Sequence, residues 1–395
     1  MSNNVIQNKT TCAIISFIIF VLILRNSLYT EASPTLHLLL SGLRFVSLGI
    51  FVLLYIRSPK KIDGIGFWLI LYGLIIGYST ITHQTDSPFV IISIGFDILL
   101  IWGLCKLYLT SYGQYILQSI IVSMSFCIYI NFILLHLHPE GLWIVDNTSY
   151  YLLGGNYNQM GRTIIPALAI AGYYRIKYNK MKLNYALLVI CSLFTLFFVE
   201  SKTSIVGILL LLTFYFIKSY RLRKWLGLSF IIFYLLFQLV VVFVQQDLSD
   251  KKHITYFVEE VLHKDLTFSN RTGVWTKSIK LIQESPINGY GYQSGSWYKE
   301  RLEVTTAHNI ILEQLITGGI LGLSVFIIMI IAALRKYSMH PDSAMQFLFL
   351  GLCTYFFMMI MEVYPMTYIV LLLILLYNTK KLASDESITQ ETKSE

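Results

Sequence analysis

Residues Ser269–Gly322 read SNRTGVWTKSIKLIQESPINGYGYQSGSWYKERLEVTTAHNIILEQLITGGILG, and the rest of the chain is organised around this stretch. Polar, ionisable and glycine residues concentrate here, whereas the sequence on both sides is strongly apolar. Three features stand out, and they are Arg271 with Trp275 four residues later, the turn-rich run Ser285–Gly291, and His308-Asn309 before an apolar helix with Gly318, Gly319 and Gly322. A histidine where a polar loop enters an apolar helix is a titratable group suited to proton transfer near neutral pH.

The composition of the whole chain is that of an integral membrane protein. Of the 395 residues, 55% are hydrophobic and 13% are charged, and the mean hydropathy is +0.64. A water-soluble globular protein has a charged fraction of about 25%. The net charge of +8 comes from basic residues in short loops between apolar runs, where they report membrane orientation. We therefore predict no nucleic-acid partner.

The cysteines and histidines form no metal-ligand pattern. The five cysteines all fall inside apolar segments and include no Cys-x-x-Cys, so we interpret them as small core residues without disulfides. The histidines outside the quoted stretch show no ligand spacing, and neither a Walker sequence nor an Asp-x-Asp pair is present. The sequence therefore predicts no metal, no bound nucleotide and no other cofactor.

Apolar runs of membrane-spanning length recur along the chain, since a helix needs about 20 residues to cross a bilayer. Twelve candidate spans result, at residues 12–29, 36–56, 65–82, 88–105, 114–136, 160–176, 183–200, 203–217, 225–245, 308–334, 343–361 and 365–379. The first of them also resembles a signal peptide, but Arg25 interrupts its apolar run, and we keep it as a span.

Lysine and arginine residues orient these spans. With the N-terminus in the cytoplasm, the basic connections at 57–61, 106, 175–182, 218–224, 335–336 and 380–381 all fall inside. The short outer loops at 30–35, 83–87, 137–159 and 362–364 carry no lysine or arginine. Cytoplasmic loops carry the excess of basic residues in membrane proteins, so this orientation is favoured.

The fold class predicted is all-α, a polytopic membrane protein with about 12 transmembrane helices and a large extracytoplasmic loop. The domains expected are transmembrane helices 1–9 at residues 1–245, the large loop at 246–307, transmembrane helices 10–12 at 308–380, and a disordered cytoplasmic tail at 381–395.

The two longest outer loops carry further expectations. In the loop at 246–307, apolar residues recur at helical spacing over Ile254–Leu262 and over Val274–Ile282. The second run follows a possible helix cap at Ser269 or Asn270. We therefore predict helices that lie on the outer membrane face. The loop at 137–159 is rich in aromatic residues. This loop either covers the same outer face of the bundle as the loop at 246–307, with its aromatic rings stacking on sugars, or forms an interfacial aromatic belt.

The motifs of the quoted stretch resemble a known family. Arg271-x3-Trp275, Ser285-Pro286-x-x-Gly289-x-Gly291 and His308-Asn309-x9-Gly319-x-x-Gly322 together are similar to the signature of the O-antigen ligase and polysaccharide polymerase superfamily. Its members are integral membrane glycosyltransferases of GT-C-like fold that use undecaprenyl-diphosphate-linked sugars. The resemblance covers about the second half of the chain at motif level and the whole chain in helix count.

The resemblance implies roles for particular residues. His308 is the expected catalytic residue that assists the attacking sugar hydroxyl, with Asn309 and Glu313 in secondary roles. Arg271 is expected in catalysis and in binding the diphosphate, together with Lys202 and Arg162, since guanidinium groups hold phosphate oxygens bidentately. Lys202 stands where the family has arginine after Ser201, so it keeps the charge but loses the planar fork. Direct displacement at the anomeric carbon predicts inversion.

Four further features are interpreted as structural or given no role. Asp97 is expected to pair with Arg44 inside the bundle. Glu362, at the outer end of the eleventh span, is an unexplained charge. Ser285–Gly291 is interpreted as architectural, and Gly318, Gly319 and Gly322 as sites of close helix packing.

The function expected from the resemblance is polymerisation of undecaprenyl-diphosphate-linked repeat units of O-antigen or capsular polysaccharide at the outer face of the bacterial inner membrane. An O-antigen ligase that uses lipid A core and a transporter or flippase of the same lipid-linked oligosaccharide remain as alternatives. The lipid-linked oligosaccharide would be both donor and acceptor, and the resemblance also admits a chain-length regulator as a partner.

Overall fold

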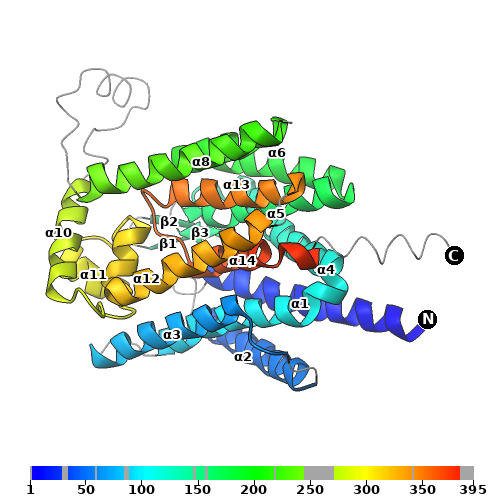
Figure 1. Cartoon of the computed structure of the whole chain (residues 1–395), viewed down its shortest axis with the longest axis horizontal. Coiled ribbons are helices and arrows are strands. Elements are labelled where there is room, and N and C mark those ends of the chain that lie inside the picture. The colour runs from blue at the N-terminus through cyan, green and yellow to red at the C-terminus, as the bar shows by residue number, and fades with distance from the viewer. Residues whose placement is uncertain are drawn as a thin grey trace.

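The computed structural model describes residues 2–28, 34–57, 60–83, 89–145, 148–155, 159–217, 219–243, 271–339 and 342–382. Helices dominate this part of the chain, which confirms the predicted all-α class (Figure 1). They are α1 (Ser2–Leu28), α2 (Pro34–Arg57), α3 (Gly64–Thr82), α4 (Phe89–Leu137), α5 (Gly161–Tyr178), α6 (Lys182–Phe198), α7 (Lys202–Phe216), α8 (Tyr220–Phe237), the π-helix η2 (Gln238–Phe243), α10 (Arg271–Glu284), α11 (Gly295–Leu302), α12 (Ile310–Met339), α13 (Ser343–Met358) and α14 (Met366–Tyr377).

Each of the twelve predicted spans coincides with one of these helices or with half of one. The fourth and fifth spans are the two halves of α4, which is broken at Tyr112, where φ is −141° and ψ is 31°. Five helical segments are long and apolar enough to cross a membrane, and they are Leu38–Arg57, Gly64–Thr82, Tyr112–Leu137, Arg221–Phe243 and Ile310–Met339. Five shorter apolar helical segments accompany them.

The core of the bundle is built from α5, α13 and α14. In α5 every residue from Gly161 to Tyr174 is buried, and in α14 every residue from Thr367 to Leu376 is buried. Two glycines bring α5 and α13 together, since a Cβ at Gly172 would overlap the Phe347 ring and a Cβ at Gly351 would overlap the Ala169 side chain. Helices that are apolar on every face, as α14 is, lie at the centre of such a bundle.

The peripheral helices expose large apolar side chains outward. Leu38 on α2, Phe67 on α3 and Leu236 on α8 are each more than half exposed. An apolar surface of this extent needs a lipid environment, because soluble proteins rarely expose large contiguous apolar patches. The protein is therefore a multi-pass membrane protein.

The predicted pair between Arg44 of α2 and Asp97 of α4 is confirmed. The Arg44 Nε donates to Asp97 Oδ1 at 3.0 Å, and Nη2 lies 2.8 Å from the same oxygen. Both side chains are buried, so each neutralises the other where neither could remain charged alone. Arg44 therefore has a structural role in the bundle.

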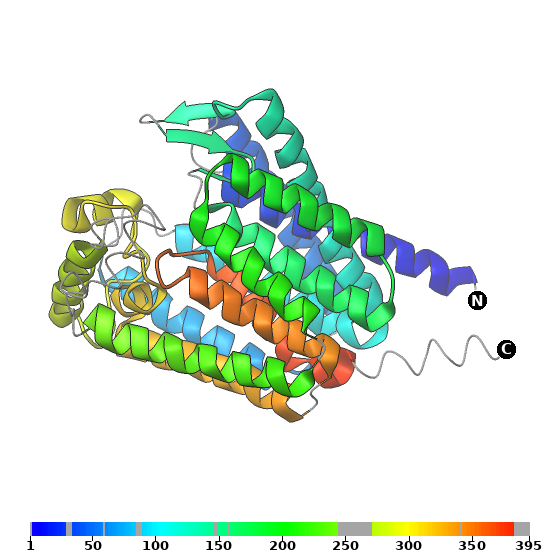
Figure 2. The same cartoon turned by 90° about the horizontal axis from the view of Figure 1, so that it is seen from above.

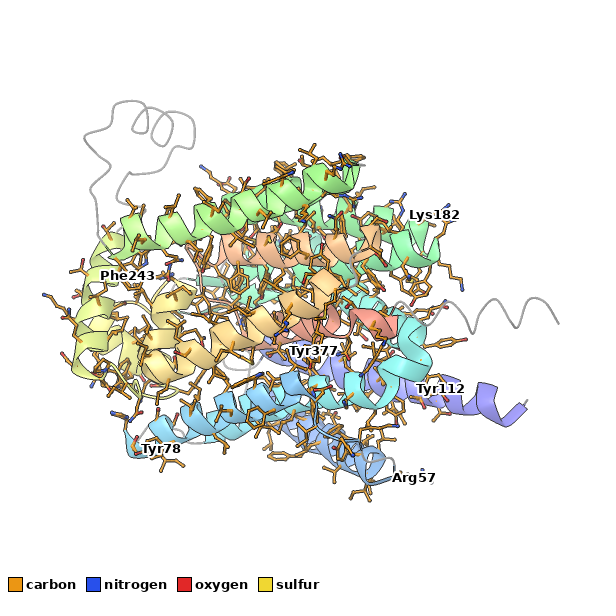
Figure 3. All side chains as sticks on the ribbon, viewed as in Figure 1. Arg57, Tyr78, Tyr112, Lys182, Phe243 and Tyr377 are labelled. Carbon is orange, nitrogen blue, oxygen red and sulfur yellow. The ribbon has the colours of Figure 1, made fainter. Side chains whose placement is uncertain are left out.

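The two ends of the bundle differ. Arg57, Tyr112 and Lys182, from three of the predicted inner connections, lie toward the end where α1 begins, whereas Tyr78 and Phe243 lie toward the opposite end (Figure 3). At that opposite end α10 and α11 lie across the bundle (Figure 1). These three connections therefore lie at the end of the bundle remote from α10 and α11.

Three short strands follow α4 in the predicted loop 137–159, where no strand was expected. They are β1 (Trp143–Val145), β2 (Thr148–Tyr151) and β3 (Gly154–Gly155), antiparallel in the order β1-β2-β3. The turned view shows them beside α1, which β3 contacts (Figure 2).

The predictions for the loop at 246–307 and for the C-terminal tail have different outcomes. The second predicted loop helix is confirmed as α10, which ends before Pro286. The predicted helix over Ile254–Leu262, the possible cap at Ser269 or Asn270, and the tail after Leu382 lie outside the described residues.

Candidate active site

Arg271 is the first residue of α10, and the helix is fixed by Trp275 one turn later. The Trp275 side chain is fully buried and packs edge-on against Phe237 of α8, with ring centroids 6.4 Å apart and planes at 87°. This contact sets the orientation of α10 on the bundle. It brings the Arg271 guanidinium to the segment that follows α13.

That segment carries Glu362, which contacts both Arg271 and His308. Arg271 Nη2 lies 2.5 Å from Glu362 Oε1, and His308 Nδ1 lies 3.6 Å from Glu362 Oε2. The side chains of Arg271 and Glu362 are 14% and 11% exposed, and that of His308 is 25% exposed. We call Arg271, His308 and Glu362 the charged cluster. The single Glu362 carboxylate thus lies close to both an arginine and a histidine, and the histidine side chain is the most exposed of the three.

His308 has a left-handed backbone, with φ of 50°, immediately before α12. With Nδ1 directed at Glu362, Nε2 is the ring nitrogen left for another contact. At 3.6 Å the Glu362 carboxylate is close to Nδ1 without a hydrogen bond to it, so it favours this ring orientation electrostatically and leaves Nε2 to face a substrate.

Asn309 holds this arrangement together. Its Oδ1 accepts hydrogen bonds from the backbone N–H groups of Ile311 and Leu312, which caps the N-terminus of α12. Its Nδ2 donates to Gln238 Oε1 of η2 and to the carbonyl of Ile360, two residues before Glu362. Asn309 thus ties the residue after His308 to the segment that presents Glu362, which is a positioning role.

Glu313, in the first turn of α12, fixes the loop on the other side of His308. Its Oε1 accepts from the Tyr298 hydroxyl at 2.7 Å, and its Oε2 accepts from the Ala307 N–H at 2.9 Å. Burial and the Glu313 carboxylate raise the pKa of Tyr298 well above its usual value, so the hydroxyl remains a donor. Glu313 therefore acts as a structural link between α11, α12 and His308.

The Ser285–Gly291 turn and the glycines of α12 form one unit, although they are separate motifs in the sequence. The helix α12 is broken at Gly319, where φ is 59° and ψ is −159°. The turn fills the break, because the N–H groups of Tyr290 and Gly291 donate to the carbonyls of Ile316 and Thr317. In return, the N–H groups of residues 320 and 321 donate to the carbonyls of residues 286 and 287. The carbonyls of residues 316 and 317 and the N–H groups of residues 320 and 321 thus find partners in the turn.

This finding confirms the architectural interpretation of Ser285–Gly291 and corrects the one for Gly319. A Cβ at Gly319 would lie 2.2 Å from the Ile287 carbonyl oxygen, so the residue serves a helix break and not helix packing. Close packing does hold for Gly318, where a Cβ would lie 2.6 Å from Ile76 of α3. The sequence pattern alone does not separate these two uses of glycine.

Arg162 approaches the cluster from the core. It lies in the first turn of α5, is 6% exposed, and donates to Gln159 Oε1 at 3.2 Å. Tyr355, Tyr364 and Tyr368 surround its guanidinium electrostatically, and Tyr364 also interacts with Glu362 and Arg271. Tyr364 therefore links Arg162 to the charged cluster. Burial and then Glu362 raise the pKa of Tyr364, which keeps its hydroxyl protonated.

Lys202 lies at the N-terminus of α7, and its side chain is exposed. Its neighbour Ser201 is buried and donates to Ser204 Oγ at 2.8 Å, and Ser204 in turn bonds to Tyr364. The α7 N-terminus thus abuts the same tyrosine as Arg162. The ion pairs of the charged cluster do not include Lys202.

Sequence reasoning missed two members of this site. Glu362 was noticed as an odd charge without a role, and Tyr364 was not singled out. The signal for Glu362 was its presence at the end of an apolar span, which is costly unless a partner is near. Its partner Arg271 lies 91 residues earlier, and only the fold joins them. Among the described residues, no group of three or more His, Cys, Asp or Glu side chains is arranged to hold a metal ion.

Comparisons with known proteins agree with the motifs. Residues 187–327 match the family model described as O-Antigen ligase, a range that runs from α6 into α12 and includes Arg271 and His308. A ComP-specific O-oligosaccharyltransferase of Acinetobacter baylyi (strain ATCC 33305 / BD413 / ADP1) is 23% identical over 274 residues, covering 63% of this chain and 47% of that protein. The match therefore spans about half the length of this relative. The resemblance predicted from Arg271, the Ser285–Gly291 turn and His308 is confirmed, since this part of the chain is similar to the O-antigen ligase-like superfamily of membrane proteins.

Proposed function

We propose that this protein is a membrane glycosyltransferase that polymerises oligosaccharide repeat units carried on undecaprenyl diphosphate. The observation that carries the proposal is the charged cluster, in which His308 and Arg271 share Glu362 at the end of the bundle remote from the basic connections. An imidazole backed by a carboxylate suits deprotonation of a hydroxyl, and arginine suits a phosphate. The family relationship supports glycosyl transfer as the reaction class.

The proposed reaction is a single displacement. The acceptor hydroxyl oxygen forms a bond to the anomeric carbon of the donor while the bond from that carbon to the diphosphate oxygen breaks. The hydroxyl proton passes to His308 Nε2, and the electron pair of the broken bond leaves with the diphosphate. The attack comes from the side opposite the leaving group, so the anomeric configuration inverts.

Arg271 and Arg162 would stabilise the departing diphosphate. The guanidinium of Arg271 uses Nη2 for Glu362, which leaves further N–H groups to donate. Arg162 is buried and interacts electrostatically with Tyr364, and Lys202 is exposed at the N-terminus of α7. Donors fixed in place before the reaction stabilise developing charge without reorganisation, which is commonly the largest contribution of an active site.

We further propose that the charged cluster faces the outside of the bacterial inner membrane. The basic connections around Arg57, Tyr112 and Lys182 lie at the other end of the bundle, which is the cytoplasmic end by the positive-inside rule. Lipid-linked sugars on the outer leaflet would then reach the site from the membrane.

The test uses the full-length protein purified into lipid nanodiscs with the undecaprenyl-diphosphate-linked oligosaccharide extracted from its host. Wild-type protein should convert this lipid to longer lipid-linked chains, and the His308→Ala and Arg271→Ala proteins should not. Wild-type elongation rates in folded His308→Ala protein would refute the assignment. Movement of the lipid across vesicles without any elongation would favour a transporter.

The acceptor is tested in the same assay. The name of the Acinetobacter baylyi relative points to transfer onto a protein, which makes a protein hydroxyl the second candidate acceptor. Product that forms with the lipid-linked oligosaccharide as the only substrate supports the polymerase. Product that forms only after addition of lipid A core, or of a candidate acceptor protein from the host, supports a ligase or an O-oligosaccharyltransferase.

A further inference from the structure

A row of aromatic rings extends from the end of α3 to α11, and it plays no part in the proposed displacement. It runs from His83, directly after α3, through Tyr290 in the turn that fills the α12 break, to Trp297 on α11. Successive ring centroids are 5.2 Å apart in both steps. His83 is exposed, and Tyr290 and Trp297 are half-buried. We call these three side chains the aromatic row.

The backbone under the aromatic row is held firmly by hydrogen bonds. The N–H of Tyr290 donates to the Ile316 carbonyl at 2.7 Å, and the N–H of Tyr292 donates to Thr80 Oγ1 at 2.8 Å. Ser294 caps α11 by accepting from the Trp297 N–H. Rings held in place in this way lose little conformational entropy when a ligand binds.

Polar groups flank the rings. The guanidinium of Arg301 lies over the Trp297 ring at 4.3 Å, and the Tyr290 hydroxyl donates to Glu284 Oε2 at 2.9 Å. Burial and Glu284 raise the pKa of Tyr290 to about 12, so this hydroxyl is neutral at physiological pH. Arg301 covers one face of the Trp297 ring. The remaining ring surface, with the Glu284 carboxylate and the Tyr290 hydroxyl nearby, offers a sugar both apolar and polar partners. The C–H groups of a sugar meet the electron-rich face of an aromatic ring, and its hydroxyls meet the polar groups.

The aromatic row leads to His308. The Trp297 ring lies 5.1 Å from that of Tyr298, whose hydroxyl donates to Glu313, and Glu313 also accepts the Ala307 N–H next to His308. Arg162, in contrast, reaches the charged cluster through Tyr364. The proposed diphosphate-binding residue Arg162 and the aromatic row are thus linked to the cluster through different elements, α5 and α11.

We propose that the aromatic row, together with Arg301, is a subsite that binds the acceptor oligosaccharide and holds its sugars beside the one activated at His308. This inference rests on the proposed function for the identity of the reaction, but the subsite is defined by its own residues. Aromatic residues near a membrane surface also form interfacial belts, so the experiment separates the two roles.

The substrates are taken from a host strain that carries the His308→Ala form of the protein. The donor is its undecaprenyl-diphosphate-linked oligosaccharide, and the acceptor is the free oligosaccharide released from that lipid by mild acid. Because the donor lipid also serves as an acceptor, transfer to the free oligosaccharide is measured separately as water-soluble product. The free oligosaccharide is varied at a fixed donor concentration, which gives an apparent acceptor KM, using full-length protein in nanodiscs. We expect Trp297→Ala to raise the acceptor KM about tenfold, with kcat and the donor KM changed less than twofold. Trp297→Phe keeps a ring and should stay within about threefold of wild type.

Tyr78→Ala is the matched control, because Tyr78 is a 59% exposed aromatic residue on the same end of α3 but outside the aromatic row. It should leave the acceptor KM unchanged. An unchanged acceptor KM in Trp297→Ala, or an equal increase in Tyr78→Ala, would overturn the subsite and leave the proposed function standing. If Trp297→Ala fails to fold, Tyr290→Leu compared with Tyr290→Phe gives the same decision, since only the first removes the ring.

Failure of the proposed function is recognised separately. If wild-type protein forms no product from these substrates, binding of the free oligosaccharide is measured directly by saturation-transfer NMR. Signal that is present with wild type and lost with Trp297→Ala supports the subsite, and equal signal from both proteins refutes it.

Discussion

Two buried arginine–carboxylate pairs in the described part of the bundle differ in a way that separates a structural role from the proposed functional one. Arg44 and Asp97 form a one-to-one pair between α2 and α4, with side chains 8% and 5% exposed. In the charged cluster, Glu362 is shared between Arg271 and His308, and the His308 side chain is 25% exposed. The first pair is closed and fully neutralised. The second contains a third ionisable group that is partly exposed to solvent, which is what the proposed reaction requires.

The sharpest test of this contrast is His308→Ala. Transfer should fall by about 10²- to 10⁴-fold, the range expected for loss of a general base, while thermal unfolding in detergent changes little. The rate is measured as lipid-linked chain elongation per folded protein. His138→Ala, which removes an exposed histidine at the end of α4, is the control and should keep the wild-type rate.

Glu362→Gln keeps the shape of the side chain and removes the charge shared by Arg271 and His308. Transfer should fall by about 10- to 100-fold, as is typical for loss of a group that orients another. Because Glu362 acts through His308, adding Glu362→Gln to His308→Ala should cause little further loss. A double variant whose transfer rate falls by the product of the two single-variant reductions would contradict a shared role.

Asp97→Asn should lower the stability of the protein without lowering its transfer rate, the reverse of what we expect for His308→Ala. Removing one partner leaves Arg44 buried and charged, which destabilises a protein by about 3–5 kcal/mol. We expect a lower unfolding midpoint in detergent and an unchanged transfer rate per folded molecule. Arg44→Met combined with Asp97→Leu should restore most of the stability. A reduced transfer rate in folded Asp97→Asn protein would contradict a purely structural role for the Arg44–Asp97 pair.

Gly319→Ala tests how far the charged cluster depends on the α12 break. The added Cβ would meet the Ile287 carbonyl and force a left-handed backbone on alanine, at a cost of about 1–3 kcal/mol. Both the unfolding midpoint and the transfer rate should fall, because the turn that docks there continues from α10, which begins with Arg271. Gly273→Ala, inside α10 with open space around its Cβ position, should be neutral or stabilising.

Asp63 offers a third charge pair, at the other end of the bundle, with the smallest expected effect. Burial alone would raise the pKa of Asp63, but hydrogen bonds from Lys106, Trp102 and the Gly66 N–H outweigh it and lower the pKa. A lowered folded-state pKa contributes stability above the unfolded value of about 3.9, and that stability is lost as the pH falls through the folded value. The difference in unfolding midpoint between wild type and Asp63→Asn should therefore shrink as the pH is lowered from 6 to about 3. A difference that stays constant with pH would exclude this linkage.

Much of the fold follows from the sequence because the membrane imposes simple rules. Apolar length located the helices that correspond to the twelve predicted spans, and the cost of a buried charge identified the Arg44–Asp97 pair. Two features were beyond such rules. The partner of Arg271 is 91 residues away in sequence, and the break at Gly319 exists only because a distant turn supplies the missing hydrogen bonds. Local patterns carry no information about either contact.

The left-handed backbone at His308 determines which inactive form of the protein would be most useful. Asparagine tolerates this conformation better than most residues, and it is shorter than histidine. A His308→Asn protein would therefore keep the loop closest to its native path while losing the imidazole. Such a variant is the natural choice for capturing the loaded lipid in place for cryo-electron microscopy.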